Sequence, residues 1–173
     1  MAEAQFDFGL ATRLDVDALG EPGRRTFRLL IRSGTSAALL WIEKQQLVAL
    51  GLALEQVLSQ VAPQELQREM LSLPSGLVTD FPLNPQLEFR VGQLQLGHDP
   101  VNMQFQIIAG DSVGEEEEDR PPRLTVRLGY AMASRLSQQI AAVAAAGRPR
   151  CPLCGEPLGD EPHQCALSNG HVH

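Results

Sequence analysis

Cys151-Pro152-Leu153-Cys154-Gly155 is followed after a short spacer by His163-Gln164-Cys165. The structure of this segment depends on one interaction, the binding of a metal ion by these residues. Zinc prefers thiolate and imidazole ligands in tetrahedral groups of four. Two cysteines separated by two residues can turn both sulfurs towards one ion, and Gly155 can adopt the positive φ that such a turn needs. In extended backbone, His163 and Cys165 point to the same side. The spacing therefore predicts a zinc site whose ligands are Cys151, Cys154, His163 and Cys165.

The alternatives to this site concern the cysteines, the fourth ligand and the role of the metal. All three cysteines lie in this segment, whereas cysteines used as core hydrophobes would be scattered. A disulfide with a spare thiol is disfavoured because the sequence begins without a secretory signal, and a cytosolic, reducing location is expected. His171 or His173 could replace His163. A site with three protein ligands and a water is the catalytic alternative, but four protein ligands leave no open position, which predicts a structural site.

The zinc-binding segment follows a predicted helix. Apolar residues recur at helical spacing over 130–146 and Gly147 ends the pattern. The segment after it is too short to bury a core, so metal binding has to supply its folding energy. The sequence therefore predicts two parts, an α+β domain over 1–147 and a zinc-knuckle tail over 148–173.

Within the domain, alternating apolar and polar residues or short apolar runs predict six strands, over 6–16, 27–31, 37–42, 87–96, 101–107 and 124–128. The first strand changes register near Ala11-Thr12, which predicts a bend. Gly92 is expected at a bulge, and Gly97-His98-Asp99-Pro100 is expected to form a hairpin turn. The continuously apolar strand 37–42 is expected at the centre of its sheet.

A long helix is predicted over 43–61, with a short helical turn over 64–71 and an apolar connector over 73–85 after it. Its apolar surface is wide, which indicates either a deeply buried helix or a subunit interface. The order βββα then occurs twice, so residues 1–71 and 86–147 are a candidate pseudo-repeat. Strands joined by short turns predict an antiparallel α+β fold.

Composition limits the classes of function. The chain has 173 residues, of which 43% are hydrophobic and 20% charged, as in ordinary globular proteins. No apolar run is long enough to cross a membrane. The formal net charge is −7, and much of it comes from the acidic loop Glu115–Asp119. This is the reverse of the basic footprint of a nucleic-acid-binding protein.

Several segments resemble a known family. They are Glu21-Pro-Gly-Arg-Arg-Thr-Phe27, Trp41-Ile-Glu-Lys-Gln45, Phe89-Arg-Val-Gly92 and Arg148-Pro-Arg-Cys-Pro-Leu-Cys-Gly-Glu-Pro-Leu158 with His163-Gln-Cys165. Together they resemble a bacterial family of about this length, number 3090 among the domains of unknown function. The resemblance covers nearly the whole chain and implies an architecture and a metal site in the tail, without an activity. Pro162 departs from the family pattern, which often has Gly before the histidine that corresponds to His163.

The expected function is that of a non-enzymatic, zinc-stabilised interaction or adaptor protein with a protein partner. Arg24, Arg25 and the tail are its candidate contact surfaces, although solvated surface charge is the simpler interpretation of the arginine pair. Single-stranded nucleic-acid binding is the alternative, disfavoured by an aromatic content of 5% and by the acidic charge. A zinc-dependent hydrolase, or an enzyme that uses His98 and Asp99, ranks third because these two residues are typical of a turn.

Overall fold

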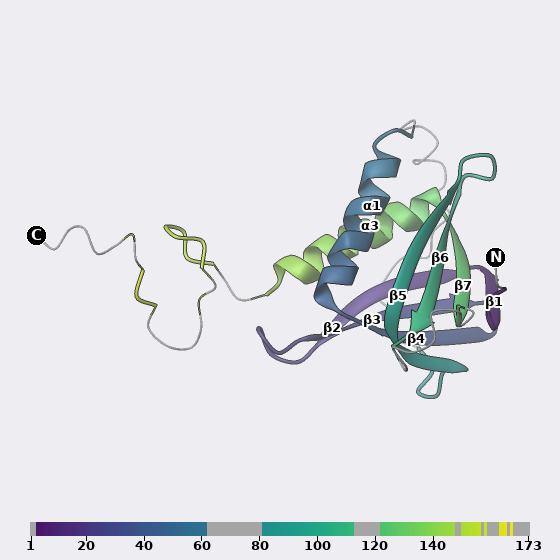
Figure 1. The fold of residues 1–173 in the computed structure, drawn as a ribbon, viewed down its shortest axis with the longest axis horizontal. Coiled ribbons are helices and arrows are strands. Elements are labelled where there is room, and N and C mark those ends of the chain that lie inside the picture. The colour runs from purple at the N-terminus through teal and green to yellow at the C-terminus, as the bar shows by residue number, and fades with distance from the viewer. Residues whose placement is uncertain are drawn as a thin grey trace, which may run out of the picture.

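A computed structural model of the chain describes residues 3–61, 81–112, 122–147, 150–156, 158, 163–165 and 167. These residues contain strands and helices of a mixed α+β fold, shown in Figure 1. In chain order they are β1 (Phe6–Leu10), β2 (Arg13–Leu19), β3 (Thr26–Ser33), β4 (Ser36–Ile42), α1 (Lys44–Leu58), β5 (Leu87–Asp99), β6 (Gln104–Asp111), β7 (Leu124–Gly129) and α3 (Tyr130–Ala145). The helical turn predicted over 64–71, most of the connector over 73–85 and the acidic loop at 115–119 lie outside the described residues.

The sheet is mixed, so the prediction of antiparallel strands is confirmed only in part. The strand order is β1-β7-β6-β5-β4-β3-β2. Most neighbours are antiparallel, but β4 runs parallel to β5 and β1 runs parallel to β7. Both parallel contacts join strands that are far apart in the sequence, and hydrophobic periodicity carries no information about such pairings. The prediction that the strand at 37–42 is central is confirmed, because β4 lies between β3 and β5.

The two ends of the strand order are joined by the bend predicted near Ala11-Thr12. The amide of Ala11 donates to the carbonyl of Arg127 in β7 at 2.7 Å, and the amide of Thr12 donates to the carbonyl of Arg32 in β3 at 2.9 Å. Consecutive amides thus bond to strands near opposite ends of the sheet, β7 and β3. The predicted first strand is therefore two strands, β1 and β2, and the corner between them curls the sheet so that its two ends meet there.

Strand β5 extends further than predicted and the hairpin turn lies later. A register shift falls between Val91 and Gln93, which confirms the predicted bulge at Gly92. The turn occupies residues 100–103 rather than 97–100. Asp99 Oδ1 accepts the amides of Val101 and Asn102 at 3.0 and 3.1 Å and so fixes the turn. Val101 is consequently 87% exposed instead of half-buried in a strand.

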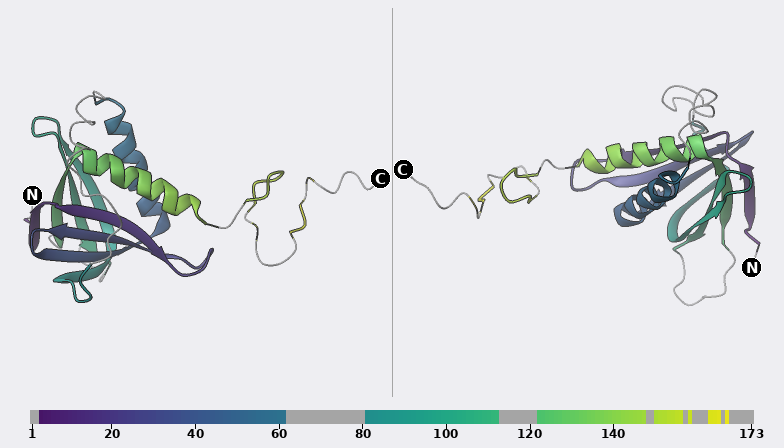
Figure 2. Two further views of the ribbon diagram at one scale, coloured as in Figure 1. Left: turned by 180° about the vertical axis from the view of Figure 1, so that it is seen from behind. Right: turned by 90° about the horizontal axis from the view of Figure 1, so that it is seen from above.

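Helices α1 and α3 cover the inner side of the curled sheet. Helix α1 lies between the β2–β3 and β5–β6 arms, with α3 across it, as Figure 2 shows. The helices predicted over 43–61 and 130–146 are confirmed with slightly shorter bounds. The buried residues of α1 are Leu47, Leu50, Gly51, Leu54 and Leu58, and those of α3 include Met132, Leu136 and Ile140. They join strand residues in one hydrophobic core.

Candidate metal centre

The tail forms a tight turn around the first cysteine pair. The amide of Gly155 donates to the carbonyl of Cys151 at 2.9 Å, and the amide of Cys151 donates to the carbonyl of Glu156 at 2.8 Å. Gly155 has a φ of 74°, in the left-handed region that disfavours side chains. Outside the turn, Arg150 Nη1 donates to the carbonyl of Gly155 at 3.1 Å. This backbone path turns both sulfurs of the pair to one side, as the Cys-x-x-Cys spacing predicts.

The four predicted ligands converge. The donor atoms of Cys151, Cys154, His163 and Cys165 all lie within 4.8 Å of one another. Cys151 Sγ is 3.8 Å from Cys165 Sγ, which equals the edge of about 3.8 Å in a tetrahedron with zinc–sulfur bonds of about 2.3 Å. Cys154 Sγ is 3.1 Å from His163 Nε2, closer than the roughly 3.6 Å that sulfur and nitrogen ligands of one zinc would have. The cluster can therefore hold a metal ion if Cys154 Sγ and His163 Nε2 move slightly apart.

The backbone of the turn lowers the pKa of the Cys151 thiol, which favours the thiolate form that binds metals. Amide hydrogen bonds from Cys154 and Leu153 are the main cause that lowers the pKa of Cys151 from 9.0 to about 6. For Cys154, the amide of Glu156 lowers the pKa, but desolvation and the neighbouring thiols Cys151 and Cys165 outweigh it and leave that pKa raised. Thiolates crowded together repel one another, and a bound cation removes this repulsion. The donor set therefore suits a cation better than it suits three free thiols.

The sequence left two alternatives to this ligand set, a disulfide and a different histidine ligand. None of the three cysteines forms a disulfide in the described residues, so no disulfide replaces the cluster. Cys151 and Cys165 are buried, and Cys154 and His163 are half-buried, so solvent still reaches two of the four ligand residues. His171, His173 and Pro162 lie outside the described residues. Within the described part of the chain, no second group of three His, Cys, Asp or Glu side chains is close enough to hold an ion.

The arginine pair, Arg24 and Arg25, lies between β2 and β3. Arg24 is exposed and its amide donates to the carbonyl of Glu21 at 2.9 Å, as part of the turn between β2 and β3. Arg25 is half-buried, and its Nε atom is buried without a hydrogen-bond partner among the described residues. Their role in binding stays a prediction.

His98 and Asp99 serve the structure of the hairpin. His98 Nε2 lies 2.8 Å from the hydroxyl of Tyr130 at the start of α3. The side chain of Asn102 donates to Asp99, and this hydrogen bond is the main cause of the lowered pKa of that carboxyl group. The carboxylate is thus occupied by its own turn, as expected for adjacent residues at a tight turn.

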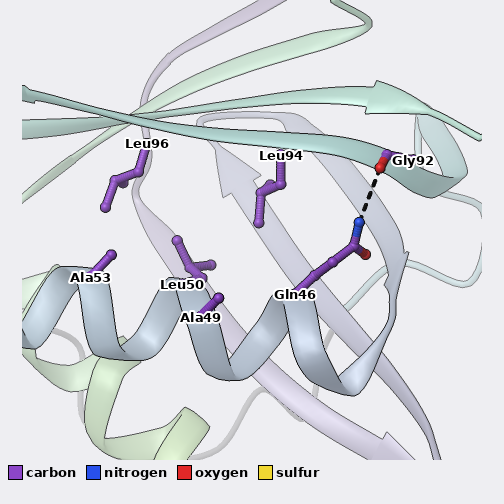
Figure 3. A pocket seen from close by; sticks show the side chains of 7 residues that line it. All are labelled: Gln46, Ala49, Leu50, Ala53, Gly92, Leu94 and Leu96. Atoms are coloured by element: carbon purple, nitrogen blue, oxygen red, sulfur yellow. Dashed lines mark hydrogen bonds between the residues drawn. The ribbon is translucent and has the colours of Figure 1, made fainter.

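Sequence reasoning missed an apolar groove between α1 and β5, shown in Figure 3. Its volume is about 380 Å³, and it is lined by Gln46, Ala49, Leu50, Ala53, Gly92, Leu94 and Leu96. At one end Gln46 Nε2 donates to the carbonyl of Gly92 at 3.0 Å. Leu94 and Leu96 were predicted to continue the strand over 87–96, but no local signal shows that a space lies opposite them.

Comparison with known proteins identifies a family without an assigned activity. No curated protein matches the chain, and no solved structure matches it. None of the helices in the described residues is long and apolar enough to cross a membrane. A match to the family described as "Protein of unknown function (DUF3090)" extends over residues 6–165, from β1 to the last cysteine of the metal cluster. The chain therefore belongs to the DUF3090 family, as the sequence resemblance predicted.

Proposed function

We propose that this protein is a non-enzymatic interaction protein whose C-terminal tail is shaped by zinc and presented to a protein partner. The observation that carries the proposal is the convergence of three thiols and one imidazole, all within 4.8 Å, in the tail. Four protein ligands complete the tetrahedral shell of zinc and leave no position for a substrate. Binding energy at such a site stabilises a fold instead of driving a reaction.

Zinc is the metal that this donor set favours. Soft thiolate ligands select zinc, copper(I) or iron–sulfur clusters, whereas carboxylate and carbonyl oxygens select magnesium or calcium. A single imidazole beside three thiolates is one of the common structural zinc sets. The Cys151–Cys165 separation of 3.8 Å is also that of two sulfurs on one zinc ion.

Metal analysis of the purified full-length chain tests the metal assignment. We expect one equivalent of zinc per chain. In competition with a chelator, Cys154→Ser should lose more affinity than the roughly 10–100-fold typical of mutations outside the ligand shell. His98→Ala is the matched control, because His98 binds Tyr130 instead of the cluster, and it should keep the zinc of the wild type. Equal zinc affinity in Cys154→Ser and wild type would contradict the assignment.

Replacement of zinc by cobalt(II) separates a closed site from a catalytic one. Three sulfurs and one nitrogen around cobalt give a tetrahedral absorption spectrum, and a closed shell should leave it unchanged when azide is added. An open position would bind azide and shift the bands, which would favour the hydrolase.

The interaction role needs a second experiment. Affinity capture with full-length wild type and with Cys154→Ser should recover a partner that depends on the intact cluster, while His98→Ala captures as much as wild type. Recovery of the same proteins at the same level by all three baits would contradict a role for the zinc-shaped tail in partner binding.

Single-stranded nucleic-acid binding is less well supported. The one tryptophan, Trp41, lies on a sheet face beside Arg28, whose guanidinium is 5.6 Å from the ring centroid. Both are already engaged, since Trp41 Nε1 donates to Glu88 and Arg28 pairs with Asp17. A labelled oligonucleotide should therefore show no binding at low salt, and salt-dependent binding would favour this alternative.

A further inference from the structure

The groove between α1 and β5 is bordered by an unpaired length of strand. Strand β4 pairs with β5 only over Leu87–Arg90, because the chain turns into α1 directly after β4. Strand β5 continues to Asp99, paired with β6 on its other side. In the described chain no strand pairs with residues 93–99 of β5 on the side that β4 has left. A strand with one unpaired side presents a row of backbone N–H and C=O groups to that side.

Side chains complete a surface of defined chemistry beside these backbone groups. Leu94 and Leu96 point from β5 towards α1, and Leu50 points back from the helix, as Figure 3 shows. Ala49 and Ala53 supply only methyl groups on the helix side, so the space between the two elements stays open. None of the seven lining residues is ionisable. An occupant therefore has uncharged, apolar side chains where it enters the groove.

The dimensions favour one extended segment over a second folded copy. Residues 93–99 offer a strand edge of about 24 Å, at about 3.4 Å per residue. A volume of about 380 Å³ is at the small end of ligand pockets, which span roughly 300–1,000 Å³. A stable interface between folded chains needs about 800 Å² from each partner, which a groove one strand wide does not supply.

We propose that β5 and α1 form a docking site for an extended peptide segment of a partner protein, which continues the sheet in the position that β4 leaves. The peptide's backbone pairs with residues 93–99, and alternate side chains, small and apolar, enter the groove between Leu94, Leu96 and the two alanines of α1. This is strand addition at a free sheet edge, in which the backbone provides affinity and the groove provides specificity. The site is separate from the metal cluster and does not depend on the zinc-binding role proposed above.

The test uses the full-length protein and a phage-displayed library of linear random peptides. A selected peptide is synthesised with a fluorescent label, and its affinity is measured by anisotropy. Ala49→Trp fills the groove from an exposed position of α1, and it should weaken binding by about tenfold or more, equivalent to about 1.4 kcal/mol. The matched control is Ala142→Trp, at an exposed position of α3 outside the groove, which should bind within about twofold of wild type.

A second readout does not depend on any variant. Hydrogen exchange of wild type, with and without the peptide, should show new protection of amides within 93–99 of β5. Cys154→Ser should bind the peptide as wild type does, which separates this site from the tail. A library that yields no peptide sensitive to Ala49→Trp, or protection confined to other elements, overturns the proposal. Sedimentation that shows a dimer disrupted by Ala49→Trp would assign the groove to a second copy and overturns it as well.

Discussion

At the scale of single residues, Asp15 is a buried charged side chain at the contact between β2 and α3. It is 6% exposed. Its carboxylate accepts from Arg13 Nε at 2.8 Å and from Gln139 Nε2 at 2.9 Å, and Arg135 Nη2 lies 3.4 Å away. Gln139 also accepts the amide of Val16. One carboxylate thus balances two guanidinium groups where the last helix meets the sheet.

We predict that Asp15→Asn destabilises the domain by about 2–3 kcal/mol, because the two arginines lose the negative charge between them. The expected loss is below that of a fully buried pair, since the side chains of Arg13 and Arg135 are 16% and 18% exposed. Asp17→Asn is the matched control on the same strand. Its pair with Arg28 is more exposed, so the cost should be about 1 kcal/mol or less. Urea unfolding measures both, and equal losses would contradict the special role of Asp15.

At the scale of elements, β5 contains two glycines that differ in the space around them. Gly92 has no room for a side chain, whereas Gly97 has room for one. A Cβ atom at Gly92 would lie 2.7 Å from the carbonyl oxygen of Asp111 and from Cα of Ser112, both backbone atoms that cannot rotate away. A Cβ atom at Gly97 would meet its nearest neighbour at 3.5 Å, an ordinary contact. Because Gly92 has no side chain, β5 can bend at the point where it leaves β4, and it can remain paired with β6.

We predict that Gly92→Ala costs about 1–3 kcal/mol or more through this overpacking. Gly97→Ala should be neutral or stabilising by about 0.5–1 kcal/mol, because alanine has less conformational entropy to lose in a strand. The measurement is the midpoint of urea unfolding for the two variants. A Gly97→Ala variant that loses as much stability as Gly92→Ala would show that the bulge is not the cause.

The same element shows what the sequence could and could not predict. Leu87, Phe89 and Val91 alternate with polar residues, so the strand itself was visible. Val101 and Met103 continue the same alternation, yet they lie in a turn because Asp99 captures two amides and Met103 has a φ of 53°. The pairing of β5 with β4, and hence the groove beside β5, depends on contacts between distant segments that no local pattern contains. The metal cluster was predictable because its four ligands lie within fifteen residues of one another.

At the scale of the whole molecule, the hydrophobic core and the metal cluster involve different residues. Every residue of the core cluster lies between Phe8 and Ile140, and the amides of Ala11 and Thr12 at the corner bond to β7 and β3. Cys151 and Cys165 are buried, but they belong to the cluster of donors and not to this core. Among the described residues, the side chains that form the core and those that form the donor cluster are therefore separate sets.

This separation predicts that residues 1–147 fold without the tail. A chain that ends at Gly147 should unfold in urea with a free energy within about 0.5 kcal/mol of the full-length protein, because distant sites without shared partners contribute additively. Full-length protein with and without chelator should show the same midpoint of urea unfolding. Limited proteolysis near Cys151–Cys165 should become faster when the chelator removes the metal, because a segment of this size has no other source of folding energy. Cys154→Ser without chelator should reproduce the faster cleavage. If truncation or chelation instead lowered the stability of the α+β domain, the tail would have to pack on the core, and the two parts would be a single folding unit.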